Sequence, residues 1–342
     1  MVTQEQIASR LGLSRQLVTF ALAGYPQVGK ASRARILAAA SEMGYRPNPH
    51  ARALKRGRTG IIGLWIPDQI SSHYTHVTRE LSQLAKKAGN ELVISEIGGG
   101  TGEQVLSNVP VDAVFAVDAP HAVHNHLRSA FGRSTPVICL GAAPCEKADC
   151  VQVDLGKGTR LVMENLLRSG LRRIVHATFV RRDAPSAERR TTYVKVMRRA
   201  GLKPEFLYYS LSLDQRPMVR RLIKRFIRAH GCPEAVFCHS DDVALGIYRG
   251  LCDLEIPVPE KVALVGCDGI QDTEYLECPL TTLVQPVAEM CGLAWKFLVR
   301  RLQNPRLARQ RAVLTAALVI RESTRRSPVE ALAEPGSGAR TS

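Results

Sequence analysis

The chain has 342 residues, of which 45% are hydrophobic and 23% charged, so it has enough apolar material for a folded core and is not a wholly disordered protein. At roughly 100 to 200 residues per domain, this length predicts two or three folded units. Lysines and arginines number 47 against 31 aspartates and glutamates, a net charge of +16 that indicates a polyanionic partner, either nucleic acid or an anionic membrane surface.

Membrane spanning, export and metal binding are all disfavoured by the sequence. No segment approaches the ~18 to 20 consecutive apolar residues of a membrane-spanning helix. Residues 1–14 lack the basic start, apolar run and cleavage site of a secretory signal, so we expect a cytoplasmic protein that does not bind membranes. The nine cysteines are scattered and lack the paired C-x₂-C spacing of a zinc site, so we expect reduced thiols, no metal and no cofactor.

The basic charge is concentrated at the N-terminus. Residues 1–58 contain ten lysines and arginines and only two glutamates, a net charge of +8 that is half of the total excess. This segment is either the contact for a polyanion or simply a solvated basic face, and only its local pattern can distinguish the two.

Two short helices are predicted first. The pattern from Thr3 to Gln6 is a capping box, and the apolar residues that follow recur at helical spacing until Gly12 ends the segment. Ser14 can cap a second helix that runs from Arg15 to about Ala23.

A third helix is predicted from near Lys30 to Gly44, the glycine being typical of a helix end. Its expected inward face carries Ile36, Leu37, Ala40 and Met43. Three such helices predict an all-α helix-turn-helix domain over residues 1–46.

In a helix-turn-helix domain, the N-terminal residues of the second helix reach base edges in the major groove. Arg15 can bond guanine bidentately and Gln16 can bond adenine, whereas Phe20 either contacts a thymine methyl group or covers the core. The head residues that we predict to contact DNA are Thr3, Ser14, Arg15, Gln16, Thr19 and Phe20.

Residues 47–58 are predicted to form a hinge. Asn48 can cap a helix, and Pro49 suits its first position, where no backbone N–H is needed. A helix of only one or two turns is not stable alone, so we expect it to be disordered until DNA and a second subunit hold it. The alternative is a plain basic linker.

From residue 59 to 325, short apolar runs alternate with helical segments, which predicts parallel sheets. The runs are too many for one doubly wound sheet, so we expect an α/β core of two similar lobes with a ligand between them. The predicted strands are Ile61–Ile66, Leu92–Ile97, Ala113–Val117, Val137–Leu140, Arg173–Ala177, Ala235–Cys238 and Val262–Val265.

The ordered motifs resemble those of the LacI/GalR family of bacterial transcriptional regulators, over about residues 2–325. The N-terminal motifs are Val2–Gly24, Val28, Ile36, Tyr45-Arg46-Pro47-Asn48 and Ala51-Arg52-x-Leu54. The core motifs are Ala187-Glu188-Arg189 with Tyr193, Pro233–Phe237, Ser240–Gly246, Pro257–Asp268 and Pro279–Thr282. The resemblance implies a periplasmic-binding-protein-like core that the chain crosses three times.

The resemblance also implies a homodimeric repressor on a pseudo-palindromic operator in double-stranded DNA, associated with the bacterial nucleoid. Leu54 would wedge between base pairs in the minor groove, with Asn48, Ala51 and Arg52 beside it at the DNA. Because Phe20 and Ala23 depart from the usual residues of the reading helix, the operator sequence of relatives does not carry over. Gly29 likewise replaces the usual serine cap of the third helix.

For the effector, the resemblance places Arg189 and Asp268 against the polar groups of a small molecule, which family frequency makes a sugar. A guanidinium fork and a carboxylate suit several hydroxyl groups or one carboxylate. Asp241 has a helix-capping role as its alternative, and Trp65 a core role. Whether the effector releases DNA or promotes binding stays open. The other predicted effector contacts are Trp65, Asp68, His73, Tyr74, Ser240 and Asp241.

Two rival functions remain. Glycine-rich segments at residues 98–102 and 156–158 could cradle phosphate in an enzyme, but neither has the required spacing, and no catalytic constellation is present, so we expect no enzyme. An exported sugar-binding protein would share the core but would not need a basic head. The tail, residues 326–342, has no leucine heptads, so we expect disorder and no tail-mediated tetramer.

Overall fold

The computed structural model describes residues 2–45, 58–67, 70–97, 109–129, 132, 135–179, 187–210 and 215–325. The chain divides into two compact units, Met1–Thr59 and Gly60–Ser342. Several predictions lie outside the described residues: nearly all of the hinge, the tail at residues 326–342, and the site residues Asn48, Ala51, Arg52, Leu54 and Asp68.

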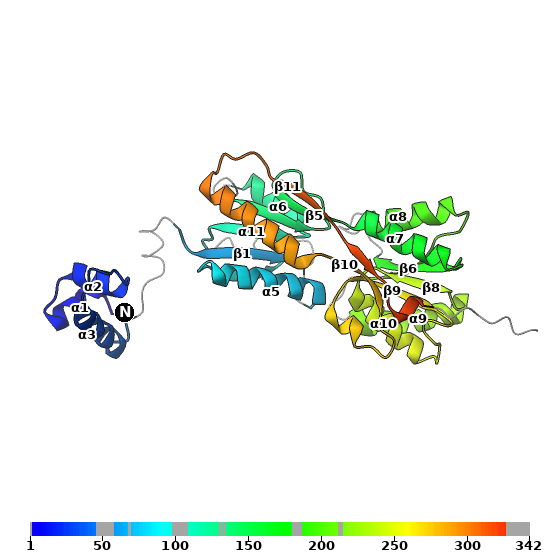
Figure 1. Ribbon diagram of the computed structural model, residues 1–342, viewed down its shortest axis with the longest axis horizontal. Helices are drawn as coiled ribbons and strands as arrows, with labels where there is room; N and C mark the ends of the chain where they lie inside the picture. The colour runs from blue at the N-terminus through cyan, green and yellow to red at the C-terminus, as the bar shows by residue number, and fades with distance from the viewer. Residues whose placement is uncertain are drawn as a thin grey trace, which may run out of the picture. The chain divides into compact units, whose positions relative to one another are not determined.

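The described part of the N-terminal unit contains three helices, as the sequence predicts (Figure 1). Thr3 and Gln6 form the capping box of the first helix, Gly12 ends it with a φ of 65°, and the Ser14 side chain accepts a hydrogen bond at the start of the second. The helices are α1 (Gln4–Leu11), α2 (Arg15–Leu22) and α3 (Lys30–Glu42). Their shared core consists of Ile7, Ala8, Val18, Ala21, Val28, Ile36, Ala39 and Ala40.

The prediction that Leu37 is a core residue of α3 is wrong. Leu37 is 47% exposed, whereas Ile36, Ala39 and Ala40 are buried. Successive residues of an α-helix lie 100° apart, so burying Ile36 and Ala40 turns Leu37 toward solvent. Gly29 stands at the N-cap of α3 and makes no side-chain capping bond.

The first sheet of the core unit has six strands, all of whose pairings are parallel. Its order is β11-β5-β4-β3-β1-β2. The strands are β1 (Ile61–Ile66), β2 (Glu91–Glu96), β3 (Ala113–Val117), β4 (Val137–Gly141), β5 (Asp149–Asp154) and β11 (Arg311–Thr315).

The second sheet repeats the arrangement of the first, in the order β12-β10-β9-β8-β6-β7. Its pairings are parallel except that of β12 with β10. The strands are β6 (Ile174–Phe179), β7 (Glu205–Tyr209), β8 (Ala235–Cys238), β9 (Ala263–Asp268), β10 (Thr281–Val284) and β12 (Ala317–Val319). The predicted core of two doubly wound lobes is confirmed.

The helices divide between the two sheets (Figure 1). Three pack in the lobe of the first sheet: α5 (Ser72–Lys87), α6 (Pro120–Arg128) and α11 (Val287–Gln303). Four pack in the other lobe: α7 (Leu155–Arg168), α8 (Ala187–Arg199), α9 (Gln215–His230) and α10 (Asp241–Cys252). Two 3₁₀ helices, η2 (Gln271–Glu274) and η3 (Glu322–Thr324), complete the elements described. Among these described elements, no helix is both long and apolar enough to cross a membrane.

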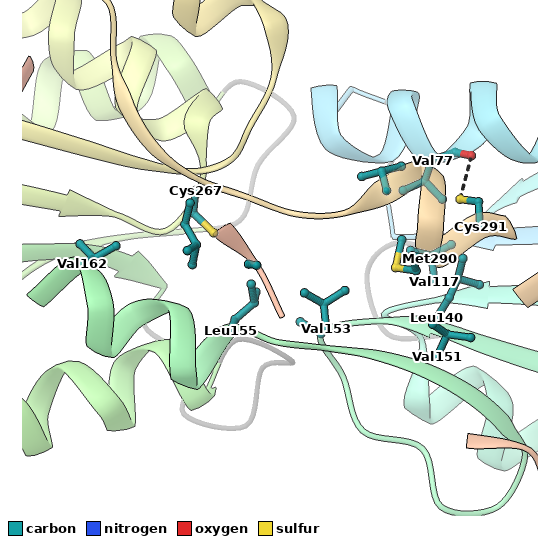
Figure 2. Packing of buried hydrophobic residues seen from close by; sticks show 14 of the residues in the cluster. Val77, Val117, Leu140, Val151, Val153, Leu155, Val162, Cys267, Met290 and Cys291 are labelled. Atoms are coloured by element: carbon teal, nitrogen blue, oxygen red, sulfur yellow. Dashed lines mark hydrogen bonds between the residues drawn. The ribbon is translucent and has the colours of Figure 1, made fainter. Parts of the chain in front are cut away.

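The chain passes between the lobes three times, as expected: from β5 to α7, from β10 to α11, and from β11 to β12. One hydrophobic cluster continues through this region. Figure 2 shows Val153 and Leu155 at the first passage, between Val162 and Cys267 of one lobe and Leu140 and Val151 of the other. Apolar burial therefore continues across the lobe junction.

Helices α9 and α10 approach closely at Gly246 and Gly250, which gives a test of the packing. A methyl group on Gly246 would lie 2.5 Å from the Arg216 carbonyl oxygen and would also overlap Val219, so Gly246→Ala should lower the free energy of unfolding by about 1 to 3 kcal/mol. Gly292 in α11 has open space around its Cα, so Gly292→Ala should instead raise it by up to about 1 kcal/mol. Urea unfolding of both variants measures this contrast, and equal destabilisation would contradict it.

Candidate functional site

The start of α2 presents the two predicted base-reading side chains to solvent. Ser14 Oγ accepts the Leu17 N–H at 3.2 Å, which fixes the first turn of the helix. Arg15 and Gln16 are exposed on that turn, and the nearest acidic partner of Arg15 is Glu5, 3.6 Å away and itself exposed. Such a loose surface ion pair contributes little stability, so the side chains of Arg15 and Gln16 are available to DNA.

The other head residues predicted at the DNA also have partners within the head. Thr3 Oγ1 accepts the Gln6 N–H at 3.3 Å. The Thr19 hydroxyl lies 2.8 Å from Gln4 Oε1, so it links α2 to α1. Phe20 is partly buried against the core of the head, with its ring centroid 5.2 Å from that of Tyr25. Of its two predicted roles, Phe20 has at least the core-covering one.

In the core unit, the buried guanidinium of Arg189 is the centre of a polar cluster. It comes from α8, and its two terminal nitrogens lie 3.2 Å from Cys267 Sγ and 2.7 Å from His239 Nε2. Because arginine can only donate, His239 accepts at Nε2 and carries its proton at Nδ1. Burial, reinforced by the charge of Arg189, holds the pKa of His239 well below its usual range and keeps the ring neutral.

Asp268 ends β9 beside this arginine. Its backbone has a φ of 128°, a conformation that residues with a side chain rarely adopt and that often marks a functional position. Gln285 Nε2 donates to Asp268 Oδ1 at 2.8 Å. Burial raises the pKa of Asp268, and the positive charge of Arg189 opposes that rise.

The other lobe contributes His73 and Tyr74 from α5, together with Asp118 after β3. The Tyr74 hydroxyl donates to Asp118 Oδ2 at 3.4 Å, and the Ala143 N–H donates to Oδ1 at 2.9 Å. Burial lowers the pKa of His73 to about 4, while Asp118 and Arg189 act on the ring with opposite signs. Side chains of both lobes therefore lie within electrostatic range of one another.

This polar cluster contains buried atoms without a hydrogen-bond partner among the described residues. They are His73 Nε2, Arg189 Nε, Tyr209 Oη, His239 Nδ1 and Gln285 Oε1. Leaving a buried donor or acceptor unpaired costs about 1 to 3 kcal/mol of free energy. Several unpaired polar atoms in one region therefore indicate a site for a polar molecule. Both N–H donors and a carbonyl acceptor are present in the set.

Ser240 and Asp241 make structural bonds. Ser240 Oγ accepts the Val243 N–H and caps α10, so the helix-capping role considered for Asp241 falls to its neighbour. Asp241 is completely buried and accepts the Gly269 N–H, the Ile270 N–H and the Thr282 hydroxyl at 2.7 to 2.9 Å. These bonds hold the turn after β9, which positions Asp268.

Trp65 does not join the polar cluster. Its side chain packs among apolar residues on the α6 side of the first sheet, with its ring centroid 5.2 Å from that of His126. Side chains alternate along a strand, so Leu64 and Ile66 face the larger core while Trp65 faces the opposite side. The prediction of Trp65 as an effector contact is therefore corrected to a core role.

Hydrogen bonds to a charged carboxylate also join the lobes. Asp242, at the start of α10, accepts from the Ser72 N–H at 3.0 Å and from the Ser72 hydroxyl at 2.9 Å, and α5 of the first lobe begins at Ser72. Arg216 Nε donates to the same carboxylate at 2.9 Å. Sequence reasoning missed this bridge because its partners are 26 and 170 residues apart.

Comparison with known proteins covers both units. Residues 163–324 match the periplasmic binding protein-like domain family. The ribose operon repressor of Escherichia coli K12 is 28% identical over 337 residues, which span 94% of this chain and 100% of the repressor.

Along nearly its whole length, this chain is therefore similar to a repressor of the kind that the LacI/GalR resemblance implies. Solved structures share the fold of this chain. A lac repressor dimer bound to operator and the anti-inducer ONPF has a TM-score of 0.78 at 20% identity, with 94% of this chain and 99% of the other covered. A LacI family regulator from Enterococcus faecium with bound ribose has a TM-score of 0.69 at 22% identity, with 77% and 98% covered.

Proposed function

We propose that this chain is a homodimeric transcriptional repressor of the LacI/GalR family, whose affinity for its operator is set by a sugar bound at the Arg189 cluster. The observation that carries the effector half is the set of buried polar atoms, contributed by both lobes, that have no hydrogen-bond partner within the described part of the chain. A ligand that completes those hydrogen bonds would favour one arrangement of the lobes over another, which is the requirement for an effector.

The charges of the cluster favour a neutral polyhydroxyl ligand over an anion. Arg189 is the buried cation, and the carboxylates of Asp118 and Asp268 lie within its electrostatic range. An anionic ligand would therefore be repelled by both carboxylates. A sugar hydroxyl, by contrast, donates and accepts at once, so it can bond Gln285 Oε1 as donor and Arg189 Nε–H as acceptor.

Ribose is the sugar that we propose first. The chain aligns over 94% of its length with a protein named ribose operon repressor, and a LacI family structure of the same fold contains ribose. A ribose-bearing compound would present the same hydroxyl groups.

The DNA half of the proposal rests on α2. Arg15 and Gln16 would read base edges in the major groove, and two copies of the head would read the two half-sites of a pseudo-palindromic operator. Within this proposal Leu54 is the minor-groove wedge, and the protein acts in the bacterial cytoplasm as a regulator rather than a catalyst.

A thermal-shift screen on the full-length protein tests the effector. Ribose at about 100 times its dissociation constant should stabilise the folded protein by about 2.7 kcal/mol and raise its melting temperature by several degrees. Ribose 5-phosphate serves as the matched anion and should give a smaller shift. A larger shift with the phosphate than with ribose would contradict the neutral-ligand argument, and no shift with any sugar would contradict the effector assignment.

A further inference from the structure

Three hydrogen bonds pass from one lobe to the other at a single residue, Ser72, which begins α5 of the first lobe. Its N–H donates to Asp242 Oδ2 at 3.0 Å, and its hydroxyl donates to Asp242 Oδ1 at 2.9 Å. The same hydroxyl accepts from Arg216 Nη2 at 3.0 Å. Asp242 and Arg216 belong to α10 and α9 of the second lobe. We call these three residues the interlobe contact.

The interlobe contact is largely shielded from water at its carboxylate. The Asp242 side chain is only 10% exposed, and Arg216 Nε donates to it at 2.9 Å in addition to the bonds from Ser72. Hydrogen bonds to a charged group are stronger than those between neutral groups, and they gain further where water is excluded. The contact therefore favours the arrangement of the lobes in which it forms, more than an exposed ion pair would.

Asp242 also serves α5 as a helix cap from the other lobe. The N-cap residue of α5, Ser71, makes no side-chain capping bond. The N–H of the first helical residue, Ser72, is instead accepted by Asp242. A carboxylate at a helix N-terminus is favoured both by the N–H groups that lack a partner within the helix and by the helix dipole. Because separation of the lobes would remove this cap, the start of α5 is coupled to the arrangement of the lobes.

The interlobe contact joins the two segments that carry the polar cluster. Ser72 directly precedes His73 and Tyr74 of the first lobe, and Asp242 follows His239 of the second lobe by three residues. A bond between Ser72 and Asp242 therefore limits how far the two halves of the polar cluster can separate.

We propose that Asp242 is a positioning residue: its bonds to Ser72 hold the lobes together and set the spacing at which the two halves of the polar cluster receive a ligand. The inference rests on the proposed function for its ligand, but not for the holding of the lobes. A protein whose binding-competent arrangement is only partly populated binds its ligand more weakly in proportion. Loss of Asp242 should thus weaken ligand binding, although its carboxylate is already occupied by Ser72 and Arg216.

Asp253 provides a matched control for Asp242. It stands at the other end of α10, its side chain is 12% exposed, and it pairs with an arginine of α9, Arg220, at 2.7 Å. Its other ion-pair partners, Lys224 and Arg249, also belong to the second lobe. Asp253→Ala therefore removes a similarly shielded carboxylate without removing a bond between the lobes.

Modification of histidines by diethyl pyrocarbonate tests the holding of the lobes in the ligand-free, full-length protein. His73 and His239 are buried in the polar cluster, one in each lobe, whereas His176 is buried inside the second lobe, stacked on Phe237. Burial lowers the pKa of all three rings, so each is neutral and reactive at pH 7 once it is exposed. Asp242→Ala should speed modification of His73 and His239 at least about fivefold and leave His176 unchanged.

Mass spectrometry assigns the modified histidines, and Asp253→Ala should match the unsubstituted protein. Equal acceleration at all three histidines would indicate a general loss of stability. No acceleration at His73 and His239 would show that the lobes stay together without Asp242. Either result, or an equal effect of Asp253→Ala, would overturn the proposal.

Calorimetric titration with ribose tests the positioning of the site. Asp242→Ala should raise the dissociation constant for ribose about tenfold, and Ser72→Ala should raise it less, because the Ser72 N–H bond remains. Asp253→Ala should leave it unchanged. An unaltered ribose affinity in Asp242→Ala would refute the positioning role. If the unsubstituted protein bound no ribose, the proposed effector would be wrong, and the histidine modification would still decide whether Asp242 holds the lobes.

Discussion

Arg189→Ala is expected to lower the affinity for ribose at least about 30-fold while leaving operator binding unchanged. The substitution removes the buried guanidinium that faces Asp268 and whose Nε–H has no partner among the residues that the structure describes. Truncating one partner of a buried, charged hydrogen bond typically costs about 2 to 5 kcal/mol of binding free energy. Calorimetric titration with ribose measures the loss, and a gel shift in the absence of ribose measures retained DNA binding.

Arg190→Ala is the matched control for this experiment. Arg190 follows Arg189 on the same helix, but its guanidinium stacks over the rings of Phe206 and Tyr208 and donates to the Tyr208 hydroxyl at 3.0 Å. Removing it should leave ribose affinity unchanged. A ribose titration of Arg189→Ala that matches the unsubstituted protein, with the melting temperature preserved, would remove Arg189 from the site.

Arg15→Ala and Gln16→Ala are each expected to reduce discrimination between the preferred operator and unrelated duplex DNA. A good bidentate contact to a base contributes about 1 to 3 kcal/mol of discrimination, and a symmetric dimer makes each contact twice. The loss should appear as weaker binding to the operator with nearly unchanged binding to unrelated sequence. Fluorescence anisotropy with the site that the unsubstituted protein selects from a random duplex pool measures both affinities.

Arg10→Ala provides the control in the head. Arg10 carries the same charge but donates to Glu42 at 3.0 Å, so it braces α1 against α3. Its removal should lower the affinity for both duplexes by a similar small factor, because the lost charge would interact with phosphates irrespective of sequence. If Arg10→Ala and Arg15→Ala changed discrimination equally, α2 would not be the reading helix.

Local signals in the sequence predict the head and most of the interior strands. Thr3, Gly12 and Ser14 act through neighbouring backbone groups, so their effect on helix ends depends on only a few residues. Strands such as Ala113–Val117 and Ala235–Cys238 are buried on both faces and therefore read as continuous apolar runs. The predicted lobes follow from the alternation of such runs with helices.

Three edge strands, β7, β11 and β12, escaped prediction, whereas the edge strand β2 was predicted and the interior strands β5 and β10 were not. β11 and β7 lie at the edges of their sheets and expose alternate or scattered side chains, so they lack the continuous apolar run of an interior strand. The antiparallel pairing of β12 with β10 joins segments about 35 residues apart, which no local pattern encodes.

The candidate site was predicted in part. Arg189, Asp268, His73 and Tyr74 meet in the polar cluster, but Asp118, His239 and Gln285 were missed. A usable signal existed for two of them: Asp118 and His239 each directly follow a buried strand, and ligands of parallel sheets bind beyond the carboxyl ends of strands. Trp65 was wrongly predicted because an aromatic ring suits a ligand site, whereas the alternation of side chains along the strand directs this ring into the core.

The most direct measurement is a titration of duplex DNA flanking the protein's own gene with the full-length protein at low salt, repeated with ribose. We expect one fragment to bind far more tightly than the others, and ribose to change that affinity by at least about fivefold, which corresponds to a coupling free energy of about 1 kcal/mol. If no fragment bound in either condition, the chain would not be a DNA-binding regulator and the account would be wrong.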